Sequence, residues 1–232
     1  EESLSQTYHS ARYPGRVVKV THPGAFSDPE RVASDPVPET VGVMVDTAVL
    51  ALAGAGDIAA AWARFVSPED RIMLKINALA SPKMATNPSV VEAIIRGLQA
   101  AGVPNENMVV YDQYGGRMRR AGFRRGNDIL GVPIEYSGSR GYSDTVTETG
   151  SGDVKFAVTA EWATAIINVP VIKDHDICGL TMSLKNLTHG VIETPSDLHR
   201  VHRRHRRARL CGEEAAGAER LVERLGWQVE EA

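Results

Sequence analysis

Short runs of apolar and β-branched residues recur along the chain, and each has the length and pattern of a β-strand. They lie at residues 16–22, 71–77, 108–111, 132–136, 154–158 and 165–169. Longer segments repeat their apolar residues at helical spacing, at 39–52, 88–101 and 180–189. The apolar stretch 41–55 around the first of these is typical of a buried helix. Shorter helices are expected from Asp57, an N-cap residue, to Phe65, and near residues 117–121.

The strand at 71–77, the helix at 88–101 and the strand at 108–111 form a βαβ unit, and such units almost always join neighbouring parallel strands. We therefore predict an α/β fold, with an open, mostly parallel Rossmann-like sheet and flanking helices, over residues 16–198. A polar segment, 1–15, precedes this domain. From residue 199 to 232 a basic segment and an acidic amphipathic helix form a tail.

Composition narrows the class of protein. The chain has 232 residues, of which 43% are hydrophobic, enough for a packed core. A net charge of −3 gives no overall bias toward nucleic acid or membranes, and no apolar run approaches the roughly 20 residues of a membrane span. The two cysteines, Cys178 and Cys211, form no CxxC pair. We expect no iron–sulfur cluster from this chain alone, and the sequence leaves any other cofactor unknown.

Polar residues stand at the carboxyl ends of predicted strands, where open parallel sheets bind their ligands. Lys75 and Asn77 end one strand and Asp112 ends the next, while Asn168, Lys173 and His175 lie in or after the strand at 165–169. On the predicted helix 180–189, Thr181, Lys185 and His189 are four apart and would share one face, with Asn186 beside Lys185.

These residues favour a site for a small anion such as a carboxylate or phosphate. Lys75, Lys173 and Lys185 would hold the anion, and Asn77, Asn168, Thr181 and Asn186 would complete its binding site. His175 would be the acid–base group, since histidine changes its charge near neutral pH. Asp112 would be a base, a metal ligand or the counter-ion of the lysines.

Each residue also has an ordinary structural interpretation. Lys75 alone is more often a surface lysine, Asp112 is often an N-cap, and His175 between two aspartates suits a solvated loop. The polar face of a helix would explain Lys185 and Asn186. His199, His202 and His205 have metal-ligand spacing, but the arginines around them would repel a cation, so we assign no metal site. The same arginines favour a solvated segment over a nucleic-acid interface.

Four segments together resemble one known family. They are LKIN at 74–77, ATNPSVVEAIIRGLQAAG at 85–102, VVYD at 109–112 and, most specifically, IINVPVIKDHDICGLTMSLKNLTHG at 166–190. Over about residues 16–198 the chain is similar to the domain of unknown function 362 family. The matching positions are Lys75, Asn77, Asp112, Asn168, Pro170, Lys173, His175, Gly179, Thr181, Lys185, Asn186 and Gly190.

The resemblance implies a bacterial or archaeal α/β protein. Some relatives carry ferredoxin-like cysteine clusters and others carry twin-arginine export signals. The KDH and LKNLTHG segments look similar to the exported, cluster-free kind, which implies a periplasmic or exported protein; a cytoplasmic one is the alternative. Relatives usually continue with further strands where this chain has its arginine-rich tail, so the chain resembles a truncated or frame-shifted member.

Two hypotheses about function follow. The first is an enzyme-like domain that binds a small anionic ligand, with a redox setting implied only by the relatives. The second is a non-catalytic accessory or binding subunit of a larger exported assembly, in which the same lysines are structural or bind an acidic partner. A protein partner or a homo-oligomer is plausible in either case, because an open sheet has an edge to cover.

Overall fold

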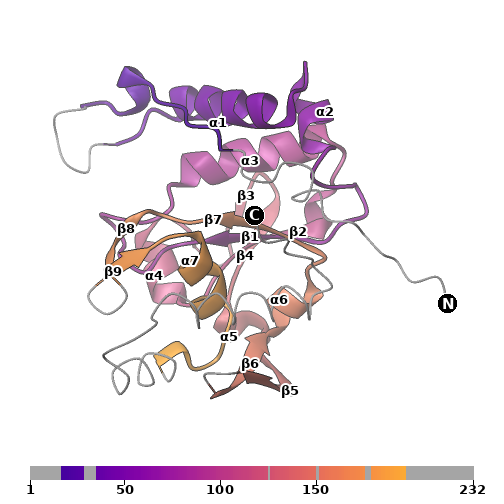
Figure 1. Cartoon of the computed structure of the whole chain (residues 1–232), viewed down its shortest axis with the longest axis vertical. Helices are drawn as coiled ribbons and strands as arrows, with labels where there is room; N and C mark the ends of the chain where they lie inside the picture. The colour runs from indigo at the N-terminus through magenta and orange to yellow at the C-terminus, as the bar shows by residue number, and fades with distance from the viewer. Residues whose placement is uncertain (1–16, 29–34, 125, 150–151, 176–178, 197–232) are drawn as a thin grey trace.

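A five-stranded sheet lies at the centre of the fold, with the strand order β3-β4-β2-β1-β7 (Figure 1). The computed structural model describes residues 17–28, 35–124, 126–149, 152–175 and 179–196. The strands are β1 (Ile72–Ile76), β2 (Met108–Asp112), β3 (Asp128–Ile129), β4 (Val132–Tyr136) and β7 (Ala165–Val169). All pairs are parallel except β3 with β4, which is antiparallel. The predicted α/β fold with a mostly parallel sheet and flanking helices is therefore confirmed.

One face of the sheet is covered by α3 (Pro88–Ala100), which connects β1 to β2. The helix starts where the Asn87 side chain accepts a hydrogen bond from the Ser89 amide, and Pro88 takes a position that needs no N–H donor. Its buried side, which includes Val91, Ile95 and Leu98, packs on the apolar side chains of β1 and β2. This confirms the predicted βαβ unit.

Two further helices, α1 (Pro38–Ala53) and α2 (Ile58–Trp62), lie outside α3 and form a second helical layer (Figure 1). The Asp57 side chain accepts a hydrogen bond from the Ala60 amide at 2.9 Å, so the predicted N-cap of α2 is confirmed. The expectation that 41–55 is buried is wrong for most of α1. Because α3 already covers the sheet, α1 buries only Val41 and Ala53 in full, and Val43 is exposed.

The opposite face of the sheet carries a second core, in which Met73, Val109 and Tyr111 pack against Phe156 and Ala160. It is built from the hairpin of β5 (Tyr142–Thr149) and β6 (Gly152–Ala157), from α6 (Val158–Trp162) and from residues after α7 (Ser183–His189). The remaining elements are η2 (Pro23–Ala25), η3 (Asn105–Asn107), α4 (Gly115–Arg120), α5 (Ser137–Arg140) and the hairpin of β8 (Lys173–His175) with β9 (Gly179–Thr181).

Two predicted elements are wrong. Residues 17–22, expected as part of a strand at 16–22, have no regular structure, because none of the described strands pairs with them and Val17 is exposed. The helix expected over 180–189 begins only at Ser183, because residues 179–181 pair with β8 as strand β9. Thr181 therefore lies on a strand and not on the helix that carries Lys185 and His189.

In the described part of the chain, every helix is too short or too polar to cross a lipid bilayer. The predicted polar segment 1–15, the predicted tail 199–232 and both cysteines lie outside the described residues.

Candidate functional site

The candidate site lies beside β1, where the order in which strands are added to the sheet reverses. From β1 the chain adds β2 and β4 on one side, and it later returns to add β7 on the other side. In open α/β sheets such a switch point leaves a crevice beyond the carboxyl ends of the strands, and ligands bind there. Lys75 and Asn77 lie at this end of β1, and Asp112 lies at the same end of β2. The β8–β9 hairpin and α7 bring the later segment to the same place.

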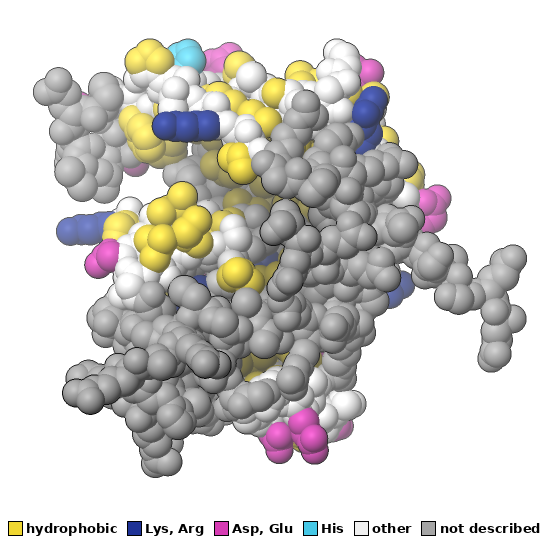
Figure 2. Space-filling model, in the orientation of Figure 1, with side chains coloured by type: hydrophobic (Ala, Val, Ile, Leu, Met, Phe, Trp, Pro, Cys, Tyr) yellow, Lys and Arg dark blue, Asp and Glu magenta, His cyan; other side chains and the backbone are white. Residues whose placement is uncertain are grey.

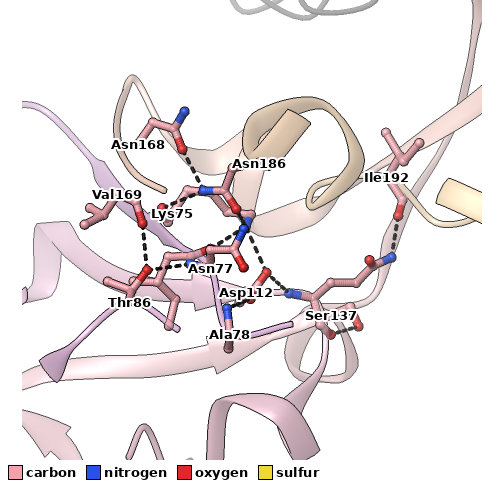
Figure 3. A network of polar contacts seen from close by, with 12 residues as sticks. Lys75, Asn77, Ala78, Thr86, Asp112, Ser137, Asn168, Val169, Asn186 and Ile192 are labelled. Carbon is pink, nitrogen blue, oxygen red and sulfur yellow. Dashed lines mark hydrogen bonds and ion pairs between the residues drawn. The ribbon is translucent and has the colours of Figure 1, made fainter. Parts of the chain in front are cut away.

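At the centre of the site is a buried ion pair between Lys75 and Asp112 (Figure 3). Lys75 Nζ donates to Asp112 Oδ1 at 2.8 Å, to the Ile76 carbonyl at 2.6 Å and to Asn186 Oδ1 at 3.2 Å. A lysine ammonium has three protons, so these three acceptors account for all of them. Lys75 is therefore a fixed charge in the wall of the site.

Asp112 is held from several sides. Besides the lysine, its carboxylate accepts hydrogen bonds from the backbone amides of Ala78 at 2.7 Å and Gln113 at 2.8 Å. Of the three roles that the sequence leaves open, these contacts favour the counter-ion. Among the described residues, no cluster of His, Cys, Asp and Glu side chains suits a metal ion.

Gly190 closes one side of the ion pair. A Cβ atom at this position would lie 2.4 Å from Lys75 Cε, 2.5 Å from Lys75 Nζ and 2.7 Å from the Asn186 carbonyl oxygen. These distances are far below ordinary contact. Any larger residue at 190 would push the Lys75 ammonium out of its place, so this position has a steric requirement for glycine.

Lys173 lies behind the pocket wall. Its ammonium is buried and donates to Asn77 Oδ1 at 2.7 Å. Burial lowers the pKa of Lys173, and the nearby charges of Lys185 and Lys75 lower it further, while Asp112 acts in the opposite direction. The three lysines and Asp112 are thus close enough for their charges to influence one another.

Asn186 and Asn168 connect α7 to the sheet. Asn186 Nδ2 donates to Asn168 Oδ1 at 2.7 Å and to the Lys75 carbonyl at 3.3 Å (Figure 3). Asn168 Nδ2 in turn donates to the Ser183 carbonyl at 2.8 Å. Thr86 forms a similar connection, because its hydroxyl donates to the Val169 carbonyl and accepts from the Asn77 amide. These amide and hydroxyl groups hold the strand ends and α7 in a fixed arrangement.

A cavity of about 180 Å³ opens beside this network. Its polar and charged wall residues are Lys75, Asn77, Asp112, Gln113, Tyr114, His175, Thr181, Lys185, Asn186, His189 and Ser196, and Leu79, Gly190 and Pro195 complete it. Thr181 is buried, and its hydroxyl has no hydrogen-bond partner among the described residues. A buried hydroxyl without a partner is costly, so this atom points to a ligand or water in the cavity.

The cavity therefore gathers most of the residues that the sequence singles out. The wall contains the predicted Lys75, Asn77, Asp112, His175, Thr181, Lys185 and Asn186, whereas Lys173 and Asn168 support it from behind. Gln113, Tyr114 and Gly190 belong to the wall but are not among the predicted site residues. Gln113 and Tyr114 directly follow Asp112 at a strand end, and that position is the signal that would have found them.

Fold and site together define a Rossmann-like α/β protein with a polar, lysine-rich pocket at the switch point of its sheet. Residues 72–225 match the model of the family described as Domain of unknown function (DUF362), and the chain belongs to this family. The match begins at β1, later than the resemblance at 16–198, and it continues into the segment from 199 onward. No curated protein and no solved structure matches the chain.

Proposed function

We propose that the cavity at the ends of β1 and β2 binds a small anion, a carboxylate or a phosphate. The observation that carries the proposal is the buried Thr181 hydroxyl, which has no hydrogen-bond partner in the described part of the chain and lies in a cavity whose wall also contains Lys75 and Lys185. A bound anion would accept a hydrogen bond from this hydroxyl and would offset the charge of the lysines.

The charge of the buried side chains supports an anion. Lys75, Lys173 and Lys185 are all buried, and the charges of Lys75, Lys185 and Asp112 all act on Lys173. Opposite charges attract more strongly where water is excluded, so these ammonium groups would attract a bound anion.

The size of the cavity limits the ligand. A cavity of roughly 150 Å³ holds a molecule the size of benzene, and drug-sized ligands need about 300–1,000 Å³. The cavity of about 180 Å³ therefore suits a short carboxylic acid, a benzoate-sized acid or inorganic phosphate.

Proton transfer would fall to His175, which lies in the cavity wall. Histidine is a common general acid or base in enzymes, and an anion bound in the cavity would lie within reach of this side chain. If His175 transfers a proton to or from the ligand, the protein is an enzyme-like domain. If it does not, the same pocket would serve a binding or accessory subunit of a larger exported assembly, as in the second hypothesis.

A thermal-shift screen tests the proposal. Wild-type protein is heated with phosphate, short carboxylates, benzoate and divalent metals, with sodium chloride at matched ionic strength as the reference. A ligand at about 100 times its Kd stabilises by about 2.7 kcal/mol, and each kcal/mol raises the Tm of a chain of this size by about 2–4 °C. We expect at least one anion to raise the Tm by about 5–10 °C.

Three variants and one control make the screen specific. Thr181→Val removes the hydroxyl at nearly constant volume, Lys185→Met removes a charge from the wall, and His175→Ala removes the proposed acid–base group. Lys155→Met removes a lysine of β6, which is not part of the cavity wall. The shift should shrink in Thr181→Val, Lys185→Met and His175→Ala, whose residues all line the cavity, and stay in Lys155→Met. A wild type that responds to no anion, or variants that respond equally, would contradict the proposal and favour the accessory-subunit hypothesis.

A further inference from the structure

The β8–β9 hairpin turns polar side chains inward, whereas its outer face is largely apolar, with the exposed Asp174 opposite Leu180. Lys173 and Thr181 are paired across the two strands, and both are buried toward the site. Strand side chains alternate between faces, so the next residues point the other way. On that outer face Leu180 is 48% exposed, and Ile172 and Met182, which flank the paired residues, are 71% and 46% exposed.

This outer face is part of a larger apolar surface. Leu184, near the start of α7, is 50% exposed and follows Met182 by two residues. Figure 2 shows hydrophobic side chains gathered on the left of the molecule, where Figure 1 places the hairpin. We call Ile172, Leu180, Met182 and Leu184 the hairpin patch. Apolar side chains grouped on the surface mark a place where another segment or molecule packs.

We propose that the C-terminal segment 213–231 of the same chain packs on the hairpin patch. The sequence of this segment predicts an amphipathic helix. Ala218, Leu221, Val222, Leu225 and Val229 follow the spacing i, i+3, i+4, i+7 and i+11, which places them on one stripe. Arg220, Glu223 and Arg224 fall on the opposite side. The predicted helix thus has an apolar stripe to bury, and the hairpin has an apolar face to cover.

The position of the described chain end favours this occupant over a separate protein. Ser196, the last described residue, lies in the wall of the cavity that the hairpin also borders. The 22 residues from Ser196 to Ala218 can span up to about 70 Å when extended. That reach is several times the roughly 10 Å length of a three-residue strand. The family match also runs continuously to residue 225, so the segment to that point belongs to the family's own sequence.

Packing of this segment would have a consequence for the site. The hairpin carries Lys173 and Thr181 on its inner face, and the proposed C-terminal helix would pack against its outer face. The position of both side chains would then depend on the C-terminal segment. This inference does not rest on the proposed function, because it concerns the face of the hairpin that points away from the cavity.

Hydrogen–deuterium exchange on the full chain tests the inference, with two pairs of glutamine substitutions. Leu221→Gln/Leu225→Gln removes the centre of the apolar stripe. Arg220→Gln/Arg224→Gln changes the neighbouring residues on the opposite face and is the matched control. We expect the first variant to exchange the amides of residues 172–184 about tenfold faster or more, because each buried leucine contributes that much or more. The control should leave them unchanged, and exchange in β1 and β2 reports whether each variant stays folded.

A reciprocal variant keeps the test independent of the tail's own stability. Leu180→Gln changes the patch alone, and it should speed exchange in residues 213–231. Equal exchange of 172–184 in all variants would overturn the inference, because nothing from the C-terminal segment would then cover the patch. Protection that rises with protein concentration would overturn it as well, since the occupant would then be a second copy of the chain.

Discussion

Replacement of Gly190 by alanine is the sharpest test of how the site is built. The added Cβ would lie 2.4 Å from Lys75 Cε and 2.7 Å from the Asn186 carbonyl oxygen. The lysine end could move alone if it were free, but its ammonium is tied to three acceptors, and the second contact is backbone. The substitution must therefore displace the ion pair or α7.

The magnitude follows from what is displaced. Breaking a buried ion pair costs about 3–5 kcal/mol, because a charge stays buried without its partner. Asp112 keeps its two backbone amide donors, which favours the lower half of this range. We expect Gly190→Ala to lower the free energy of unfolding by about 3–4 kcal/mol, measured by urea titration followed by circular dichroism.

Gly42→Ala is the control for the same chemical change. Gly42 lies inside α1, and a Cβ atom there would meet nothing within 4 Å. Alanine favours a helix by about 0.5–1 kcal/mol over glycine, so this variant should be slightly more stable than wild type. A Gly190→Ala variant as stable as Gly42→Ala would refute the reasoning, because the Lys75 ammonium would then not be fixed against residue 190.

Three further predictions concern the ion pair, a helix start and the pH dependence of stability. Lys75→Met should lower the free energy of urea unfolding by about 3–5 kcal/mol, and the double variant Lys75→Met/Asp112→Asn should cost less than the two single variants together; additive costs would contradict the coupling. Asp57→Ala should destabilise by about 1 kcal/mol through loss of the α2 cap, whereas Asp57→Asn should retain most of it; equal melting temperatures would count against the cap. Because burial lowers the pKa of Lys173 below 10.5, the unfolded chain binds more protons than the folded one between the two pKa values. Stability relative to Lys173→Met should therefore rise with pH across that window, and a flat difference in urea unfolding would contradict this.

The central fold was predictable because its signals are local. The strand at β1 and the helix at α3 are long enough to show their own periods, and Asn87, Pro88 and Gly102 mark the helix ends. The two elements that failed depend on distant partners. Residues 17–22 have the alternation of a strand, but no strand within the described ranges pairs with them. The alternation of apolar and polar residues does not show whether another strand is available to pair with the segment.

The prediction of a helix from residue 180, where the structure has the β8–β9 hairpin, was wrong for a different reason. Leu180, Leu184 and Leu187 follow the spacing i, i+4, i+7, which is typical of one helical face, so the sequence favoured a helix from residue 180. In the structure Leu180 belongs instead to the outer face of β9, where it pairs with Asp174. An apolar face turned outward is the reverse of the usual pattern, and the periodicity alone could not reveal it.

The sequence predicts the position and the residue types of the candidate site. It does not predict which of these residues line the cavity and which stand behind its wall. Lys75, Asn77 and Asp112 were predicted as site residues because they lie at strand ends, where parallel sheets bind their ligands. That Lys173 would stand behind Asn77 depends on how the hairpin folds over the strand end, which no local pattern encodes. The close approach of Gly190 to Lys75 likewise joins residues far apart in the chain.

Diffraction from crystals soaked with an anion that scatters anomalously would show whether the cavity binds an anion. Selenate would stand for a phosphate-like ligand, and 4-bromobenzoate for a carboxylate. We expect at least one of them to give a peak in the cavity at the ends of β1 and β2, with anion oxygens in hydrogen-bond distance of the Thr181 hydroxyl and the Lys185 ammonium. Crystals in which both anions bind only on the outer surface, with the cavity holding water at saturating concentration, would contradict the proposed anion site.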